Sequence, residues 1–73
     1  MSTPTEAVLA LLRRLPSEAP ADVVAAILTT ERPWAPPVTP RAAARLLGRL
    51  VQSGVVVRRT RGDGLVVFRA LRG

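Results

Sequence analysis

The sequence predicts an α+β fold that is mainly α-helical, with a small β-hairpin at its C-terminal end. Three segments of the 73-residue chain repeat apolar side chains at intervals of three and four, the spacing of one helix face. Residues that cap helices stand at the starts of two of these segments. The last part changes to short valine-rich runs around a glycine-rich tip, which is typical of two antiparallel strands.

The first helix is expected over about residues 4–15. The segment TPTE at residues 3–6 has the form of a capping box, with threonine at the cap and glutamate three residues later. Pro16 ends the helix, because proline has no N–H and clashes with the preceding turn. The apolar side chains of this segment are Val8, Leu9, Leu11, Leu12 and Leu15.

A second helix is expected over about residues 20–31, after a short connection at residues 16–19. Pro20 suits the start of a helix, and Asp22 suits the first turn, where the helix dipole favours negative charge. The expected inner stripe consists of Val23, Val24, Ile27 and Leu28. Because β-branched residues lower the helix propensity of this segment, tertiary packing has to hold it.

Residues 32–38, RPWAPPV, predict a stiff connection without regular structure. The three prolines remove backbone donors and drive the residues before them towards extended conformations. Trp34 lies inside this connection and allows two interpretations. We expect it to fold back as a hydrophobic plug over a small aliphatic core. The alternative is an exposed anchor for a partner, because tryptophan is enriched among residues that dominate binding energies.

The third helix, over about residues 40–53, is the segment that bears most directly on function. Thr39 is a good N-cap, Pro40 fits the first helical position, and Gly54 fits the left-handed residue that closes a helix. The expected inner stripe consists of Ala43, Leu46, Leu47 and Leu50. The opposite face consists of Arg41, Arg45, Gly48, Arg49 and Gln52. That outer face is cationic and has no acid, and its glycine lets another surface come close.

A two-stranded hairpin is expected over about residues 55–71, with the pattern VVVRRT-RGDG-LVVFRAL. Its tip is basic because Arg58, Arg59 and Arg61 lie on or beside it. The tripeptide Arg-Gly-Asp is interpreted here as a turn and not as an adhesion motif.

Two registers of this hairpin are compatible with the turn residues. The first has a turn at residues 62–63, or a four-residue loop at 61–64. Its inner and edge pairs are Thr60–Leu65, Val57–Phe68 and Val55–Ala70. The second has a type I′ turn at residues 63–64, which is the stronger local signal. We favour the first register, because the second sets Arg58 opposite Arg69 and like charges across a strand pair repel.

The positive charge of the chain is concentrated in its second half. The formal net charge is +6. Residues 1–38 have three arginines and four acids, a net −1, whereas residues 39–73 have eight arginines and one acid, a net +7. This asymmetry indicates a polyanionic partner, with nucleic acid first and an acidic membrane or protein surface second. The alternative is a solvated surface that uses arginine without a partner.

Length and composition predict one small domain without disulfides. A chain of 73 residues has room for one core and buries only ~60% of its extended surface. There is no cysteine, and no apolar run approaches the length of a signal peptide or a membrane span. We therefore expect a cytoplasmic, nucleoid-associated protein. Arginine without any lysine, with abundant Ala, Pro, Gly and Val, suggests a GC-rich bacterial or phage genome.

The residue types argue against an enzyme. Histidine, cysteine, tyrosine and lysine are all missing, so the commonest general bases, nucleophiles and metal ligands are not available. The five acids show no close pairing in the sequence that would suggest a catalytic dyad or a hard-metal site. We expect no catalytic residue, no cofactor and no metal.

The stretch RAAARLLGRLVQSGVVVRR at residues 41–59, with three helices leading into a hairpin, resembles the winged helix-turn-helix superfamily of DNA-binding domains. Repressors of the multiple-antibiotic-resistance type, the DNA-reading domain of bacterial chromosome translocases and one small-subunit ribosomal protein share this style. The resemblance covers roughly residues 4–71 and does not single out one family. It implies a third helix in the major groove and a two-stranded C-terminal wing that touches the backbone or the minor groove.

The same resemblance implies the residues of a DNA site. On the third helix the candidate DNA-binding residues are Arg41, Arg45, Arg49 and Gln52. On the wing they are Arg58, Arg59 and Arg61. Arginine suits this role because its planar guanidinium can donate two parallel hydrogen bonds to a guanine edge or a phosphate.

The sequence thus predicts a small DNA-binding protein, either a transcription regulator or a chromosome- or phage-associated factor, with double-stranded DNA as partner. The alternative is a protein-interaction module of a larger complex, in which Trp34 and the proline segment anchor an acidic protein. Structured RNA and a homodimer are further alternatives that the sequence leaves open. We expect no membrane partner, and single-stranded binding is disfavoured because no aromatic platform is available for stacking bases.

Overall fold

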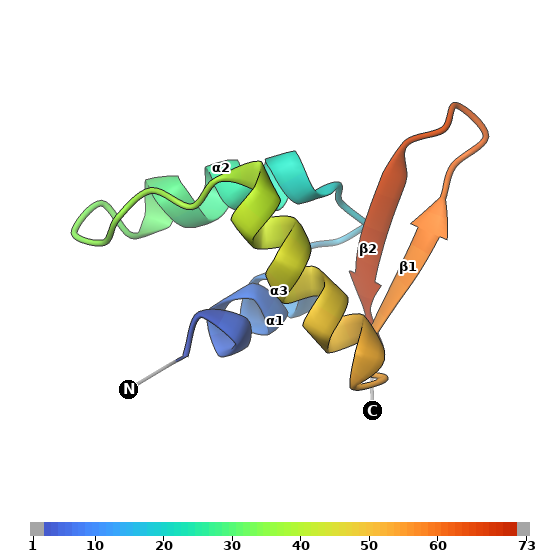
Figure 1. Ribbon diagram of the computed structural model, residues 1–73, viewed down its shortest axis with the longest axis horizontal. Helices are drawn as coiled ribbons and strands as arrows, with labels where there is room; N and C mark the ends of the chain where they lie inside the picture. Colours follow the sequence, from blue (N-terminus) through green and yellow to red (C-terminus); the bar gives the residue numbers. More distant parts are fainter. Residues whose placement is uncertain (1–2, 72–73) are drawn as a thin grey trace.

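The computed structural model describes residues 3–71, in which three helices are followed by one antiparallel hairpin (Figure 1). The elements are α1 (Pro4–Arg14), α2 (Ala21–Glu31), α3 (Pro40–Gln52), β1 (Val56–Thr60) and β2 (Val66–Ala70). This is the expected α+β class, and its layout is consistent with a winged helix-turn-helix. In Figure 1, α3 crosses in front of α1 and α2, and the hairpin rises beside it. The helix bounds lie within one residue of those expected.

The predicted helix caps are confirmed for α1 and α3. The Thr3 hydroxyl accepts the Glu6 N–H at 3.1 Å, and the Glu6 carboxylate accepts the Thr3 N–H at 3.3 Å, which completes the capping box. The Thr39 hydroxyl accepts the Ala42 N–H at 3.1 Å. Gly54 has a φ of 80°, the left-handed conformation that closes a helix at low cost only with glycine. The Thr39 bond thus fixes the start of α3, and the conformation of Gly54 reverses the chain after its end.

The core lies where the three helices meet the hairpin. Its buried members are Val8, Leu11, Leu12, Ala19, Val24, Ala25, Leu28, Ala43, Leu47, Leu50, Val56, Phe68 and Ala70. The expected inner stripe of α3 is confirmed, although Leu46 is only half-buried.

One residue of the expected α2 stripe was placed wrongly. Val23 is 41% exposed, and Ala25 is buried instead at 1%. Residues two apart point to different sides of a helix, so both cannot face the core. The side of α2 with Ala25 packs against α1 and α3, whereas Val23 faces solvent. Pro20 is the N-cap of α2 and forms no side-chain capping hydrogen bond, although its carbonyl accepts the Val24 N–H at 3.1 Å.

The connection between α1 and α2 contains a strand-like residue that the sequence did not predict. Ala19 pairs with Phe68 of β2: the Ala19 N–H donates to the Phe68 carbonyl at 3.0 Å, and the Phe68 N–H donates back at 2.8 Å. The short connection therefore adds a third line of backbone to the far edge of β2. It ties the hairpin to the helical part of the molecule.

The favoured hairpin register was wrong by one residue, and so was its alternative. The structure pairs Thr60 with Val66, Val57 with Arg69 and Arg58 with Phe68. The loop has three residues, because the Arg61 N–H donates to the Leu65 carbonyl at 2.8 Å and the Gly64 N–H donates to the Arg61 carbonyl at 2.9 Å. Gly64 has a φ of 88°, the left-handed residue that such loops need. This register also keeps Arg58 away from Arg69.

Trp34 does not cover the core, contrary to the favoured interpretation. Its side chain is 78% exposed. The Ala35 N–H donates to the Arg32 carbonyl at 3.0 Å, so residues 32–35 form a β-turn with Trp34 at its third position. The Thr29 hydroxyl accepts the Val38 N–H at 3.0 Å and closes the base of the loop. The turn and the proline residues hold the indole away from the helices.

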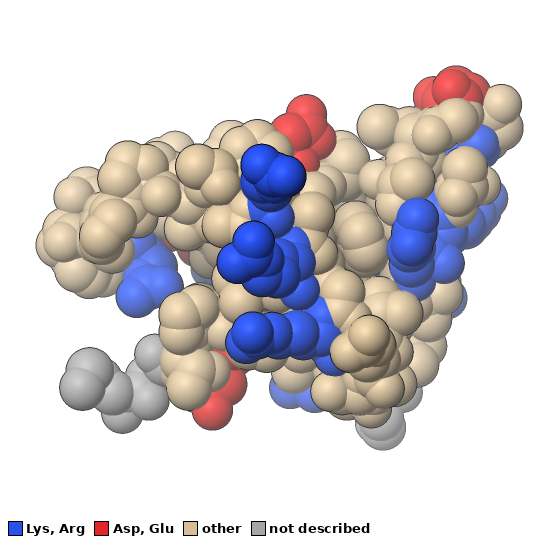
Figure 2. All heavy atoms as spheres, in the orientation of Figure 1, with Lys and Arg blue, Asp and Glu red and all other residues tan. Residues whose placement is uncertain are grey.

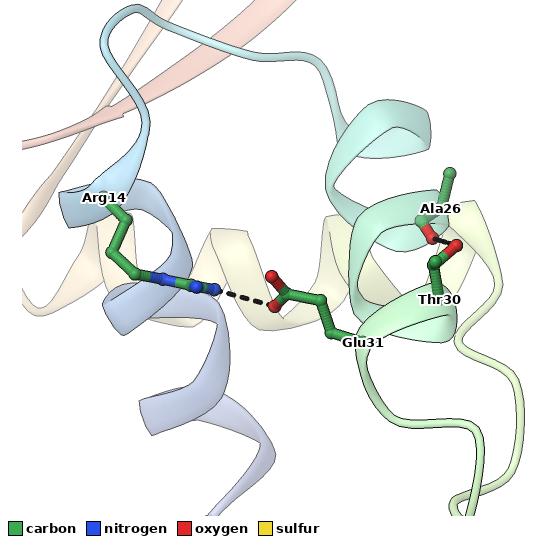
Figure 3. A network of polar contacts seen from close by, with 4 residues as sticks. All are labelled: Arg14, Ala26, Thr30 and Glu31. Carbon is green, nitrogen blue, oxygen red and sulfur yellow. Dashed lines mark hydrogen bonds and ion pairs between the residues drawn. The ribbon is translucent and has the colours of Figure 1, made fainter.

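An ion pair joins the C-terminal ends of α1 and α2. Figure 3 shows Arg14 and Glu31 pointing towards each other, and Arg14 Nη2 donates to Glu31 Oε1 at 2.7 Å. This hydrogen bond, followed by the attraction of the carboxylate charge, raises the pKa of Arg14 above its ordinary value. Both side chains are exposed, so solvent screens the pair and its contribution to stability is small.

Candidate nucleic-acid interface

The exposed side of α3 carries an arginine column. Arg41, Arg45 and Arg49 are four residues apart and all exposed, and the rise of a helix spaces their Cα atoms about 6 Å apart. The opposite side of α3 is fixed in the core by Ala43, Leu47 and Leu50. Because the core sets the rotation of the helix, the three guanidinium groups share one outer side. Figure 2 shows this column of blue side chains along α3.

The arginine column forms no ion pair with the described residues. Within residues 3–71, the ion pairs that form involve Arg14, Arg59 and Arg61, and no carboxylate lies within 4.0 Å of the column arginines. Gln52, the fourth candidate on α3, is exposed in the last turn. The helix therefore presents uncompensated cationic donors to solvent.

The hairpin separates the three candidate wing arginines. Successive side chains of a strand point to opposite faces, so Arg58 shares a face with buried Val56, and Arg59 does not. Arg58 lines the hollow towards α3. Arg61 lies in the tip, where its Nε is 4.0 Å from Asp63 Oδ1. The sequence grouped these residues as one set, whereas the fold puts only Arg58 beside α3.

Arg59 takes part in an internal contact on the outer face of the hairpin. Its Nη1 is 3.8 Å from Glu18 Oε2 in the connection before α2. Val67 of β2 is paired with Arg59 and is only 1% exposed. Paired residues share a face of the hairpin, so this ion pair lies on the face away from the hollow. Arg59 is thus partly neutralised where Arg58 is not.

A hollow of about 480 Å³ separates α3 from the hairpin. Its lining residues are Ala21, Ala44, Gly48, Val51, Gln52, Arg58, Val66 and Phe68. On the α3 side, little side-chain volume projects into this hollow, because Ala44 has only a methyl group and Gly48 has no side chain. A Cβ added at Gly48 would meet nothing within 4 Å, so internal packing does not require glycine there. The sequence indicated the open glycine but not the hollow, which depends on the angle between helix and hairpin.

The hollow has a cationic side chain on each flank. The arginine column runs along α3 on one side, and Arg58 projects from β1 on the other. Figure 2 shows the two blue groups with a tan surface between them. Red side chains lie at the hairpin tip, at the upper edge and at the lower left of this view, and none lies within the tan surface itself. The arrangement can bind a linear polyanion between the two cationic flanks, over a neutral surface that no large side chain obstructs.

A second hollow lies at the other end of the hairpin, between the last turn of α1 and the end of β2. Its volume is about 650 Å³, and Arg13 and Arg69 stand among apolar residues there. None of the candidate residues lines it. Among residues 3–71, no group of three acidic, histidine or cysteine side chains gathers to hold a metal ion. The described helices include none with the length and apolarity needed to cross a membrane.

No protein-family model matches this chain, and no curated protein is similar enough to count as a relative.

Proposed function

We propose that this chain is a small winged-helix DNA-binding protein, a transcription regulator or a chromosome- or phage-associated factor. In this proposal α3 enters the major groove of double-stranded DNA, and the hairpin lies along the backbone. The observation that carries the proposal is the uncompensated arginine column on α3, which faces solvent beside Arg58 of the hairpin.

The dimensions of α3 suit a major groove. The helix has 13 residues and is about 20 Å long, and the groove is about 12 Å wide and admits one helix. Small side chains at Ala44 and Gly48 let the helix axis approach the base edges closely. Arg41 and Arg45 are nearest the N-terminal end, the part of a reading helix that contacts bases in helix-turn-helix proteins.

The hairpin supplies a second contact of a different kind. Arg58 faces the hollow and is free to meet a phosphate there, which fixes orientation without reading sequence. Arg61 lies at the tip of the same hairpin and extends the basic edge. Arg59 is the weakest of the three candidates, since it already lies near Glu18.

The second candidate function is a protein-interaction module. The observation in its favour is the exposure of Trp34 at 78% of its surface, on the apex of a turn. In this case the arginines would speed association with an acidic protein, and Trp34 would supply the anchor.

Fluorescence anisotropy with labelled random duplex DNA, at several salt concentrations, tests the first proposal. We expect log K against log salt to fall with a slope on the order of −4, because each of about four neutralised phosphates contributes about −0.9. A single strand and a structured RNA serve as competitors. No binding at low salt would overturn the DNA proposal. Preferred binding of the RNA would make structured RNA, and not duplex DNA, the partner.

Two charge-matched double variants locate the interface. Arg45→Ala with Arg49→Ala should weaken duplex binding at least tenfold, because each arginine contact is worth about 1–3 kcal/mol. Arg13→Ala with Arg69→Ala removes the same charge from exposed positions outside α3, and we expect less than about a threefold change. Equal losses in the two variants would mean that net charge, not the α3 surface, drives binding.

A further inference from the structure

The solvent side of α2 exposes apolar side chains and has no arginine. Val23, Ala26 and Thr30 lie on the solvent side of α2, at the three- and four-residue spacing of one helix face. The loop that follows α2 contains a further exposed apolar side chain, Trp34. We call these four residues the α2 face. Val23 is 41% and Trp34 is 78% exposed, so the α2 face includes two of the large apolar side chains that the described chain leaves open to solvent.

The hydroxyl of Thr30 on the α2 face is already hydrogen-bonded within the helix. The Thr30 hydroxyl donates to the Ala26 carbonyl at 2.9 Å, as Figure 3 shows. Its proton is therefore not available to a partner, and Thr30 presents its methyl group together with an acceptor oxygen. The indole N–H of Trp34 is then the one side-chain donor of the α2 face that a partner has to satisfy, so this face gains most from a partner that offers apolar surface and one acceptor.

The backbone at Trp34 is ordered before any partner binds. The turn bond from the Ala35 N–H to the Arg32 carbonyl at 3.0 Å fixes its backbone, and Pro33 restricts the first turn position. Thr29 anchors the end of the loop through Val38. A pre-ordered anchor loses little conformational freedom on binding, which is the main cost of docking an exposed loop.

The charge distribution restricts how two copies can meet. Residues 39–73 have a net charge of +7, so contacts between α3 or the hairpins of two molecules are repulsive. Residues 1–38 have a net charge of −1 and include the whole α2 face. The α2 face is thus a surface on which two molecules can associate without bringing their arginine columns together.

We propose that the α2 face binds a second copy of this chain about a two-fold axis, with the two α2 helices antiparallel. In that arrangement the helix dipoles oppose each other favourably. Each Trp34 then lies over the first turn of the other α2, where Val23 offers apolar surface and Asp22 offers an acceptor for the indole N–H. An isologous contact of this kind closes after two copies and leaves both α3 helices outside it.

The interface is small, and its strength follows from its size. Two buried tryptophans remove roughly 300–500 Å² from water, and the neighbouring side chains add less than that. The total is at the low end of specific interfaces, so the dissociation constant should be roughly micromolar or weaker. The inference does not depend on DNA binding, since none of the four residues belongs to the candidate DNA site.

Sedimentation equilibrium of the full chain without DNA, from about 1 μM to about 1 mM, tests the dimer. Trp34 is the only tryptophan and there is no tyrosine, so intrinsic fluorescence reports this site alone. We expect a monomer–dimer transition, with an emission that shifts to shorter wavelength over the same concentration range. A monomer at every concentration with unchanged emission would overturn the proposal and leave Trp34 to a different protein.

Three variants decide whether association uses the α2 face. Trp34→Ala and Val23→Glu should each raise the dissociation constant at least about tenfold, since each removes one side of the Trp34–Val23 contact, which the two-fold axis makes twice. Leu71→Glu is the matched control, because Leu71 is 42% exposed and outside the α2 face, and it should leave the dimer intact. Thermal melting should be similar for wild type, Trp34→Ala and Val23→Glu. A dimer that persists in both α2-face variants, or that dissociates equally in the control, would contradict the proposed arrangement.

Discussion

At the scale of single residues, Gly48 has a cost that the fold does not explain. A glycine inside a helix is less favourable than alanine by about 0.8–1.0 kcal/mol. Glycine is needed where φ is positive or where another group lies too close for a Cβ, and neither applies at Gly48. Gly54, six residues later, does have a positive φ of 80°. The two glycines therefore have different roles. Gly54 lets the chain reverse after α3, and Gly48 keeps the floor of the hollow free of a side chain.

Substituting these two glycines by alanine should change stability in opposite directions. Gly48→Ala should raise the free energy of unfolding by about 0.5–1 kcal/mol, because the helix gains propensity and the new methyl meets no neighbour. Gly54→Ala should lower it by about 1–2 kcal/mol, because alanine is strained in the left-handed region. Urea unfolding followed by circular dichroism measures both. A destabilised Gly48→Ala would show that the fold itself needs this glycine.

At the scale of the elements, local sequence signals predicted the three helices but not, for every helix, which side is buried. The capping box at Thr3, the cap at Thr39 and the glycine at position 54 act within one turn of chain, so the sequence is sufficient to place them. The burial of Val23 was mispredicted because Asp22 and Glu31 are the only charged residues of α2. An almost uncharged helix has more than one apolar side, and only its neighbours decide which is buried.

The other differences between the predicted and the observed structure depend on distant parts of the chain or on small differences in free energy. The Ala19 pairing needs Phe68, which local patterns around Ala19 cannot indicate. The hairpin register depends on whether the tip holds two, three or four residues, and glycines at both 62 and 64 allow more than one solution. Trp34 is exposed because the loop is closed by Thr29, nine residues before Val38. Of the candidate site, the arginine side of α3 was predictable, and the division of the wing arginines was not.

The corrected register makes a prediction about the hairpin as an element. Arg58 and Arg59 are neighbours with the same charge, but only Arg58 lines the hollow beside α3. Arg58→Ala should therefore weaken duplex binding about tenfold, and Arg59→Ala should change it less than about threefold. The two variants have the same net charge, so anisotropy at one salt concentration compares them directly. Equal or reversed effects would mean that DNA contacts the outer face of the hairpin.

At the scale of the whole molecule, Phe68 joins the two halves of the fold. Its ring is 6% exposed in a core that is otherwise made of aliphatic side chains. Its backbone pairs with Ala19 on one side of β2 and lies opposite Arg58 on the other. The angle between α3 and the hairpin, and with it the width of the hollow, therefore depends on this residue. A domain of this length has a stability of about 4–11 kcal/mol at the usual value per residue.

Phe68→Ala should cost about 3–5 kcal/mol, which is a large share of that stability. We expect helix and hairpin to unfold together in one transition shifted to much lower urea, because the ring contacts both parts of the core. Circular dichroism follows the helices, and amide hydrogen exchange of β1 and β2 follows the hairpin. Phe68→Leu, which keeps most of the apolar volume, should lose much less and retain duplex binding. If Phe68→Ala kept its helical signal while the strand amides exchanged freely, the hairpin would be an independent arm, and the hollow would not be a fixed feature of the molecule.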